Sequence, residues 1–300
     1  SGGGGTRTAP GRLPSGRDMS AILRFAPSPT GRLHLGHAYS ALFTWRQAEA
    51  VGGRVLLRIE DIDRGRCRPE FEAGILEDLA WLGLEWETPV RRQSEHLDDY
   101  ARALQRLEDR GLLYPCFCTR ADIRREIAAS PSAPHGADGP IYPGTCRNLS
   151  ADERAARRAI EAHALRLDVA ASLDRVDAEV LTWEDAEAGR QVADPASHGD
   201  VVLARKDMPT SYHLAVSVDD ALQGVTLVTR GQDLFAATHV HRLLQALLGL
   251  PVPAYHHHRL ITDNEGRRLA SRDRATELAE LRQDGWTAGD VRRELGFETD

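Results

Sequence analysis

The chain has 300 residues, of which 41% are hydrophobic and 28% charged, and its formal net charge is −7 at pH 7. These values indicate a soluble globular protein with one large or two modest domains, and no apolar run reaches the roughly 18 residues of a membrane span. The acidic balance does not favour a nucleic-acid-binding protein, although it is compatible with a local basic surface.

The first 18 residues are rich in glycine and lack the apolar central region of a secretory signal. We expect them to be a disordered tail or an expression remnant, with Met19 as the native start. Three of the four cysteines lie close together, which favours metal binding over a disulfide framework. We therefore expect a cytoplasmic protein that contacts no membrane.

The first predicted unit is a strand, a loop and a helix. An extended segment, Leu23–Ala26, runs into a turn rich in proline and serine, and a helical pattern follows over Gly36–Ala50. Such a unit places backbone N–H groups and a helix N-terminus where a phosphate can bind. His34 and His37 lie on one side of the first helical turn and can donate to phosphate oxygens. On its own, His-x-Gly-His also fits a loop with two structural histidines.

A second strand over Val55–Ile59 completes a βαβ unit and predicts a parallel sheet. It leads into Glu60, Asp61 and Asp63, at the sheet edge where ligands bind; a solvated acidic turn is the alternative. Two helices follow, each ended by a glycine: 71–82 with Gly83, and 97–107 with Gly111.

Residues 111–199 have a different character, which predicts an α+β insertion lobe. They contain the capping box Ser150–Glu153 and an alternating segment, Leu165–Val169, that predicts antiparallel strands. Cys116, Cys118 and Cys146 offer three thiolates, whereas structural zinc takes four ligands. His135 is the ordinary choice for the fourth ligand and Tyr142 the less ordinary one; three free thiols are the metal-free alternative. We interpret Cys67 as incidental.

The parallel pattern is expected to resume at residue 200. Three strands are predicted, followed by an apolar helix closed by Gly249: Val201–Ala204, His213–Val218, Val225–Thr229 and the helix Val240–Leu248. Residues 255–300 are expected to hold a short strand, a loop and polar helices. The tract Tyr255-His256-His257-His258 looks like a metal ligand set, but we interpret it as mainly structural.

Together these elements predict an α/β protein. A Rossmann-type parallel sheet, formed by 19–110 and 200–254, is interrupted by the lobe 111–199, and a short helical segment, 255–300, follows. We expect the ligand cleft at the carboxyl ends of the parallel strands.

Five segments resemble, in order, the motifs of class I aminoacyl-tRNA synthetases of the glutamyl type. They are Arg24-Phe25-Ala26-Pro27-Ser28-Pro29-Thr30-Gly31 with His34-Leu35-Gly36-His37, Arg58-Ile59-Glu60-Asp61-Ile62-Asp63, Ser211-Tyr212-His213-Leu214-Ala215-Val216 through Asp219-Asp220, Thr229-Arg230-Gly231-Gln232-Asp233-Leu234, and Gly266-Arg267-Arg268-Leu269-Ala270-Ser271-Arg272. The resemblance implies that the third of these is a strand.

The resemblance also implies the site residues. Glutamate would be bound by Arg24, Phe25, Ala26, Pro27, Ser28, Glu60, Tyr212 and Arg230, and ATP by His34, Gly36, His37 and Ser271. Glu60 would hold the substrate amine, and an arginine fork, from Arg24 or Arg230, would bind the side-chain carboxylate. His34, His37, Arg268, Ser271 and Arg272 would be the catalytic residues.

The second signature loop departs from the family pattern, Lys-Met-Ser-Lys-Ser. Arg268 stands at the first lysine and Ser271 at the second, with Arg272 adjacent. Either arginine can stabilise phosphate charge, but with a geometry unlike that of an ammonium group. We expect the departure to affect the rate of activation more than the fold or the glutamate pocket.

The pattern Cys116-x-Cys118…Tyr142-x-x-x-Cys146 and the end of the chain at Asp300 resemble the glutamyl-queuosine tRNA(Asp) synthetase family. The resemblance implies one structural Zn²⁺ on those four residues, no anticodon-binding domain, and a monomer. It further implies tRNA-independent activation of L-glutamate with ATP and Mg²⁺, and transfer to queuosine in the anticodon loop of tRNA(Asp). A truncated glutamyl-tRNA synthetase that charges tRNA(Glu) and a non-catalytic RNA-binding paralogue are the alternatives.

Overall fold

The computed structural model describes residues 20–129, 135–136, 139–177, 179, 181–261 and 276–297. Its strands are β1 (Ile22–Phe25), β2 (Arg54–Ile59), β3 (Glu87–Arg92), β4 (Leu113–Cys116), β5 (His135–Gly136), β6 (Gly139–Pro140), β7 (Ala164–Leu167), β8 (Thr182–Asp185), β9 (Gly189–Val192), β10 (Val202–Ala204), β11 (Leu227–Gly231) and β12 (Ala254–His258). Its helices are α1 (Leu35–Ala50), α2 (Pro69–Trp81), α3 (Leu97–Glu108), α4 (Arg120–Ala129), α5 (Ala151–Ile160), α6 (Val169–Leu173), α7 (Tyr212–Leu222), α8 (Ala237–Leu248), α9 (Leu278–Gln283) and α10 (Ala288–Glu294). The expected tail, 1–18, and Met19 lie outside the described residues.

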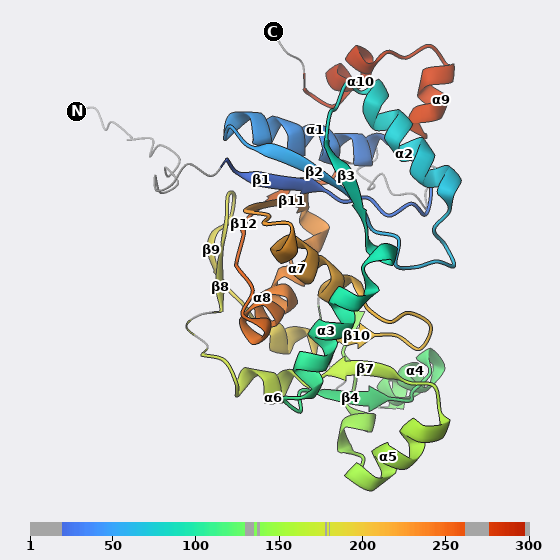
Figure 1. Cartoon of the computed structure of the whole chain (residues 1–300), viewed down its shortest axis with the longest axis vertical. Coiled ribbons are helices and arrows are strands. Elements are labelled where there is room, and N and C mark those ends of the chain that lie inside the picture. Colours follow the sequence, from blue (N-terminus) through green and yellow to red (C-terminus); the bar gives the residue numbers. More distant parts are fainter. Residues whose placement is uncertain are drawn as a thin grey trace, which may run out of the picture.

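Parallel strands form the centre of the molecule, as the βαβ pattern predicts. β1, β2 and β3 make one parallel sheet, and β11, β12 and β8 make another, with β9 antiparallel at its edge. The two sheets meet where β1 lies beside β11: Thr226 N donates to Ile22 O at 2.9 Å, and Arg24 Nη1 donates to Thr229 O at 3.1 Å. Figure 1 shows the resulting run of strands across the upper part of the molecule.

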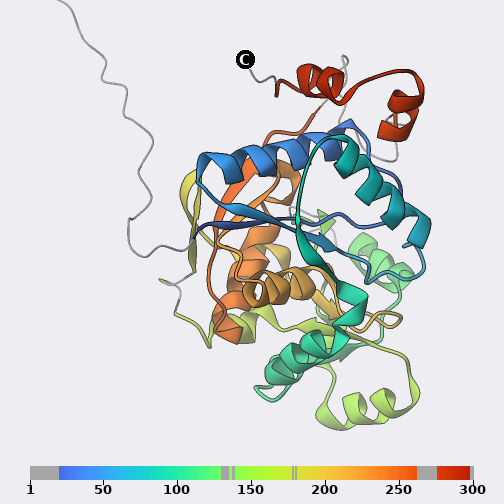
Figure 2. The ribbon, with the colours of Figure 1, turned by 45° about the horizontal axis from the view of Figure 1, so that its top comes forward.

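Helices cover both faces of this sheet, and the apolar side chains of β1 and β2 are mostly buried between the layers. The helices α1, α2, α9 and α10 lie on one face, as Figure 2 shows. They pack around Leu23, Leu57 and Leu79. On the other face α3, α7 and α8 pack together around Leu214 and Leu243. The described chain is therefore a three-layer α/β unit with an attached lobe.

Helix ends were the most accurately predicted features. Gly83 and Gly249 follow α2 and α8 with φ values of 71° and 62°, a conformation that a side chain would strain. At the start of α5, Glu153 N donates to Ser150 Oγ at 3.2 Å and Ser150 N donates to Glu153 Oε2 at 2.8 Å. The predicted capping box is confirmed.

The prediction of a strand over His213–Val218 is wrong, because these residues form α7. Leu214, Val216 and Val218 alternate with other residues as they would in a strand. Every residue from Leu214 to Asp220 is buried, since α7 is enclosed by α3, α8 and the sheet. Apolar residues then occupy all sides of the helix, and periodicity no longer separates the two structures.

The parallel sheet does resume after residue 200, at β11 and β12, but the prediction that Val201–Ala204 belongs to it is wrong. β10 pairs antiparallel with β7, which pairs antiparallel with β4, so β10 belongs to the sheet of the lobe. Conversely, β8 lies within 111–199 but pairs parallel with β12, where Tyr255 faces Asp185. The antiparallel prediction for Leu165–Val169 is confirmed for its first three residues by β7, whereas Asp168 and Val169 begin α6.

The lobe lies at the lower end of the view in Figure 1 and has a small core of its own. Tyr114, Phe117 and Tyr142 pack there with Cys116 and Cys146. Among the described residues, every helix is too short or too polar to cross a bilayer.

Candidate active site

A cavity of about 400 Å³ opens at the carboxyl ends of β1, β2 and β11. Its walls come from the first signature, the end of β2, the start of α7 and the end of β11: Arg24, Phe25, Ala26, Pro27, Ser28, Thr30, Gly31, Arg32, His37, Ser40, Glu60, Tyr212, Thr229, Arg230, Gly231 and Leu234. All the residues expected around glutamate are in this set. Segments more than 200 residues apart in the chain thus meet at one sheet edge, as expected for this fold class.

The two signature histidines form the start of α1. His34 is the N-cap residue: Gly36 N donates to its Nδ1 at 3.1 Å, and His34 N donates to His37 Nδ1 at 3.3 Å. The ring centroids are 3.8 Å apart. Because Nδ1 accepts in each neutral ring, the ring N–H is on Nε2, where it is a donor suited to phosphate oxygens.

One wall of the cavity is a cluster of buried charges, which we call the paired cluster: Arg24, Arg58, Glu60, Asp219 and Asp220. Asp220 Oδ1 accepts from Arg58 Nη1 at 2.8 Å and from Arg24 Nε at 3.0 Å. Burial pushes the pKa of Asp220 upward, but the two guanidinium groups outweigh it and hold the pKa below its usual range. Arg58 has no exposed side-chain surface. The paired cluster therefore joins β1, β2 and α7 through compensated charges.

Glu60 and Arg24 are the members of the paired cluster that line the cavity, and Glu60 is its carboxylate there. Its Oε1 accepts from Arg58 Nη2 at 3.3 Å, a long hydrogen bond. Burial raises the pKa of Glu60 above its usual value, although Arg58 and Arg24 oppose the rise. A cationic group bound in the cavity would be favoured next to this carboxylate.

Asp219 lies deeper, with no exposed side-chain surface. It accepts from Arg91 Nε at 2.8 Å, from Gln93 Nε2 at 2.8 Å and from Tyr100 OH at 2.9 Å. These bonds tie α7 to β3 and α3, so Asp219 supports the site from behind rather than lining it.

Arg230, on β11 beside β1, lines another part of the cavity wall and has a different environment. It donates from Nε to His257 Nε2 at 3.0 Å, from Nη1 to Tyr212 OH at 3.2 Å and from Nη2 to Thr238 Oγ1 at 2.6 Å. A further contact, at 3.2 Å, joins Nη1 and Nδ1 of His241. Among the described residues no carboxylate forms an ion pair with this guanidinium.

The histidines around Arg230 are neutral near pH 7. Burial, and then the Arg230 charge, lowers the pKa of His257 to about 4. The same two causes lower the pKa of His241 well below its usual value. Arg230 is therefore a buried cation, 5% exposed, whose immediate described partners carry no negative charge. Such a site favours an anionic ligand.

The lobe brings the predicted metal ligands together. The sulfur atoms of Cys116, Cys118 and Cys146 lie within 4.8 Å of one another. The hydroxyl oxygen of Tyr142 is 3.5 Å from the sulfurs of Cys116 and Cys118 and accepts from Cys146 N at 2.9 Å. Three thiols and a phenol at this spacing fit a tetrahedral ion such as zinc. The side chain of His135 is outside the described part of the chain, and Cys67 is not in the group.

The predicted second signature loop is outside the described residues, with Arg268, Ser271 and Arg272. The segment that follows it returns to the first signature, because Leu278 N donates to Leu33 O at 2.8 Å and Glu277 pairs with His34. Glu277 and Leu278 thus contact the chain around the first signature.

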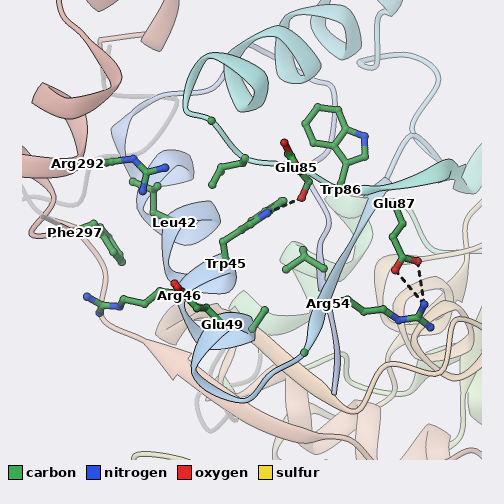
Figure 3. A pocket seen from close by; sticks show the side chains of 15 residues that line it. Leu42, Trp45, Arg46, Glu49, Arg54, Glu85, Trp86, Glu87, Arg292 and Phe297 are labelled. Atoms are coloured by element: carbon green, nitrogen blue, oxygen red, sulfur yellow. Dashed lines mark hydrogen bonds and ion pairs between the residues drawn. The ribbon is translucent and has the colours of Figure 1, made fainter. Parts of the chain in front are cut away.

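A larger cavity, about 610 Å³, lies at the amino ends of β2 and β3 and is shown in Figure 3. Several of its polar groups are already paired: Arg54 Nη1 donates to Glu87 Oε1 at 3.1 Å, and Trp45 Nε1 donates to Glu85 O at 2.7 Å. Ligands in open α/β sheets bind at the carboxyl ends of strands. We therefore assign the active site to the smaller cavity.

Sequence reasoning missed the partners of Arg230. His257 was part of a tract interpreted as structural, and Asp185, which contacts it, lies 72 residues away in the chain. The one available signal in the sequence was that His257 lies in a predicted strand of the same parallel sheet as Arg230. For His256 and His258 the structural interpretation agrees with their contacts, to Glu187 Oε1 and Ser40 Oγ, each at 3.0 Å.

Three comparisons bear on the whole chain. Residues 21–294 match the family "tRNA synthetases class I (E and Q), catalytic domain". The glutamyl-Q tRNA(Asp) synthetase of Rhodobacter capsulatus is 50% identical over 280 residues, which are 92% of this chain and 100% of that protein. The protein of the same name from Symbiobacterium thermophilum is 44% identical over 91% of this chain and 85% of its own length.

The structure is also similar to the crystal structure of a glutamate-tRNA synthetase from Elizabethkingia anophelis. The TM-score is 0.76 at 26% identity, over 92% of this chain and 61% of the other. The chain thus spans about three-fifths of that longer protein.

Proposed function

The chain belongs to the class I tRNA synthetases of the glutamyl and glutaminyl (E and Q) type and, within them, to the glutamyl-Q tRNA(Asp) synthetases, and we propose that it activates L-glutamate with ATP and transfers it to queuosine at the wobble position of tRNA(Asp). The observation that carries the proposal is the charge pattern of the cavity. A carboxylate, Glu60, and the guanidinium of Arg230, which has no carboxylate partner in the described part of the chain, line the same space of about 400 Å³.

Glutamate matches this pattern, because it carries one ammonium group and a second carboxylate. Glu60 accepts hydrogen bonds from the ammonium group, and Arg230 with Tyr212 binds the side-chain carboxylate. Arg24 is the weaker candidate for the carboxylate, since Asp220 already compensates its charge at 3.0 Å. Phe25, Ala26, Pro27 and Ser28 enclose the bound amino acid.

ATP binds at the start of α1. His34, His37 and the backbone around Gly36 donate to the triphosphate, whose charge Mg²⁺ also neutralises as part of the substrate. Arg268, Ser271 and Arg272 complete this site from the second signature loop.

The reaction needs no side-chain nucleophile. The α-carboxylate oxygen of glutamate attacks the α-phosphorus in line, the α–β phosphoanhydride bond breaks, and pyrophosphate leaves with its negative charge held by the donors above. A ring hydroxyl of queuosine then attacks the activated carbonyl, and AMP leaves. Positioning and electrostatic stabilisation supply the catalysis.

We further propose that Cys116, Cys118, Tyr142 and Cys146 hold one structural Zn²⁺, in a monomeric cytoplasmic enzyme. The ion would fix the loops that frame the small core of the lobe. Metal analysis of the purified protein tests this: about one zinc per chain is expected, with loss in Cys146→Ser and a lower affinity in Tyr142→Phe. Retention by Tyr142→Phe together with loss in His135→Ala would instead identify His135 as the fourth ligand.

The test of the function is ATP–pyrophosphate exchange without tRNA, followed by transfer of labelled glutamate. Glutamate is expected to support exchange, and tRNA(Asp) is expected to accept glutamate only when it contains queuosine. Loading of tRNA(Glu) instead would show a truncated glutamyl-tRNA synthetase. A complete lack of exchange, in the protein and in Ser271→Lys, would show the non-catalytic paralogue that the altered loop suggests.

A further inference from the structure

We propose that Asp185 and His257 are positioning residues that hold the Arg230 guanidinium in one orientation and thereby set the preference for glutamate over glutamine. The proposal rests on the proposed function, because it assumes that Arg230 binds the side chain of the amino acid. We call the chain of contacts Asp185–His257–Arg230 the relay.

The relay runs across three neighbouring parallel strands. In the sheet, β12 lies between β8 and β11, with Tyr255 beside Asp185 and His257 beside Arg230. Asp185 Oδ2 is 2.7 Å from His257 Nδ1, and His257 Nε2 accepts from Arg230 Nε at 3.0 Å. All three residues are at most 5% exposed. Strand register therefore fixes the order of the groups.

Asp185 determines which nitrogen of His257 carries the proton. Its Oδ1 accepts from the backbone N–H groups of Glu187 and Ala188, both at 3.0 Å, which hold the carboxylate in place. These bonds and His257 keep the pKa of Asp185 below its usual value, although burial opposes them. An ionised carboxylate only accepts hydrogen bonds, so the ring proton is on Nδ1 and Nε2 has the lone pair that Arg230 needs.

The remaining contacts leave one direction for the ligand. Nε, both N–H groups of Nη1 and one of Nη2 have acceptors in His257, Tyr212, His241 and Thr238. A guanidinium has five N–H groups, so one on Nη2 has no partner among the described residues. The carboxylate of the relay, on Asp185, is separated from Arg230 by the imidazole ring of His257.

Substrate choice follows from this arrangement. The side-chain carboxylate of glutamate supplies the direct counter-ion that Arg230 lacks, whereas the amide of glutamine leaves a buried cation uncompensated. If His257 took the other tautomer, its Nε2–H would face an N–H of the guanidinium. The two donors would repel each other, and Arg230 would no longer be oriented toward the substrate. The relay thus acts on the amino acid and not on ATP.

The experiment compares Asp185→Asn with Glu187→Gln. The first removes the charge of the relay in a side chain of the same shape and favours the wrong tautomer of His257. The second makes the same change in a neighbouring carboxylate, which contacts His256 at 3.0 Å and is largely exposed. Glutamate binding by calorimetry, KM values for glutamate and ATP in pyrophosphate exchange, and the ratio of kcat/KM for glutamate and glutamine are measured.

Asp185→Asn is expected to raise the Kd and KM for glutamate about tenfold, to lower the glutamate-to-glutamine ratio about tenfold, and to leave the KM for ATP within about twofold. Glu187→Gln is expected to match the parent protein. His257→Gln, whose amide oxygen can still accept from Arg230, is expected to lose less glutamate affinity and less of the glutamate-to-glutamine ratio than His257→Leu. This second pair of variants tests the proposal if Asp185→Asn does not fold.

Equal losses for glutamate, glutamine and ATP would overturn the relay and give Asp185 a purely structural role. An unchanged ratio in a folded Asp185→Asn protein would overturn it as well. A parent protein that neither binds glutamate nor supports exchange would instead overturn the proposed function, so the two failures are distinguishable.

Discussion

The two walls of the active-site cavity hold buried arginines in opposite electrostatic states. In the paired cluster Arg24 and Arg58 share the carboxylate of Asp220 at 3.0 and 2.8 Å. On the neighbouring strand β11, Arg230 contacts a threonine, a tyrosine and two neutral histidines. Both walls are buried in the same fold, so the difference is in the partners and not in the exposure.

The comparison separates architecture from ligand binding. A compensated buried cation joins elements and is costly to break, whereas an uncompensated one is unfavourable until an anion arrives. The paired cluster thus contributes to stability, and Arg230 contributes to affinity. Substitutions on the two walls should therefore change different measured quantities.

The largest expected effect is on stability, in Arg58→Met. The change leaves Asp220 and Glu60 with fewer cationic partners in a fully buried place, and we expect a loss of about 3–5 kcal/mol in the free energy of unfolding. Denaturant unfolding measures it. Arg54→Met on the same strand is the control, because its pair with Glu87 is about half exposed and should contribute less than about 1 kcal/mol. Equal losses in the two variants would contradict the comparison.

The second prediction concerns Arg230→Gln. Because no described carboxylate depends on Arg230, we expect the melting temperature to change by only a few degrees, while glutamate affinity falls at least about 100-fold. Calorimetry and thermal unfolding on the same sample measure both. Arg230→Lys keeps the charge without the planar fork of the guanidinium, so its glutamate affinity should lie between those of the parent protein and Arg230→Gln. A large loss of stability with normal glutamate binding would reverse the roles of the two walls.

A smaller effect is expected at Asp78, a carboxylate with an incomplete partner. It is fully buried on α2, and its nearest cation, Arg282 Nη2, is 3.4 Å away. Burial raises its pKa to about 6, although Arg282 opposes the rise. The carboxyl group of Asp78 therefore binds its proton more tightly in the folded protein than in the unfolded chain. Its contribution to the free energy of unfolding is fully present below about pH 4 and is lost as the pH rises through about 6.

Asp78→Asn should accordingly stabilise the protein at pH 7.5 by about 1–2 kcal/mol. The gain should shrink as the pH falls toward 4, where the native aspartic acid is protonated too. Unfolding free energies across this pH range measure it. A gain that is independent of pH would contradict the raised pKa of Asp78, and a loss of stability at pH 7.5 would show that Arg282 pairs Asp78 adequately.

Much of this arrangement could be predicted from local sequence. The glycines at residues 83 and 249 and the capping box at Ser150 act within a few residues, so the chain pattern locates the helix ends. The motifs around Arg24, Glu60 and Arg230 each end a parallel strand, and parallel strands bring their carboxyl ends to one edge. For that reason the predicted residues meet in one cavity.

What was not predicted depends on contacts between distant segments. α7 was taken for a strand, since burial on all sides removes the helical stripe from its sequence. β10 pairs in the lobe and β8 in the main sheet, and pairing partners have no local signal. The same holds for the relay: nothing near Asp185 indicates that it fixes the tautomer of a histidine beside Arg230.

The most direct test of the account is equilibrium binding of L-glutamate and L-glutamine to the protein and to Arg230→Gln. The account predicts that the parent protein binds glutamate at least about 30-fold more tightly, because an unpaired buried charge costs about 2 kcal/mol or more. It also predicts that the ratio falls to within about threefold in Arg230→Gln. Equal affinities in the parent protein, or the same ratio in the variant, would contradict the claim that Arg230 is the uncompensated cation that selects the substrate.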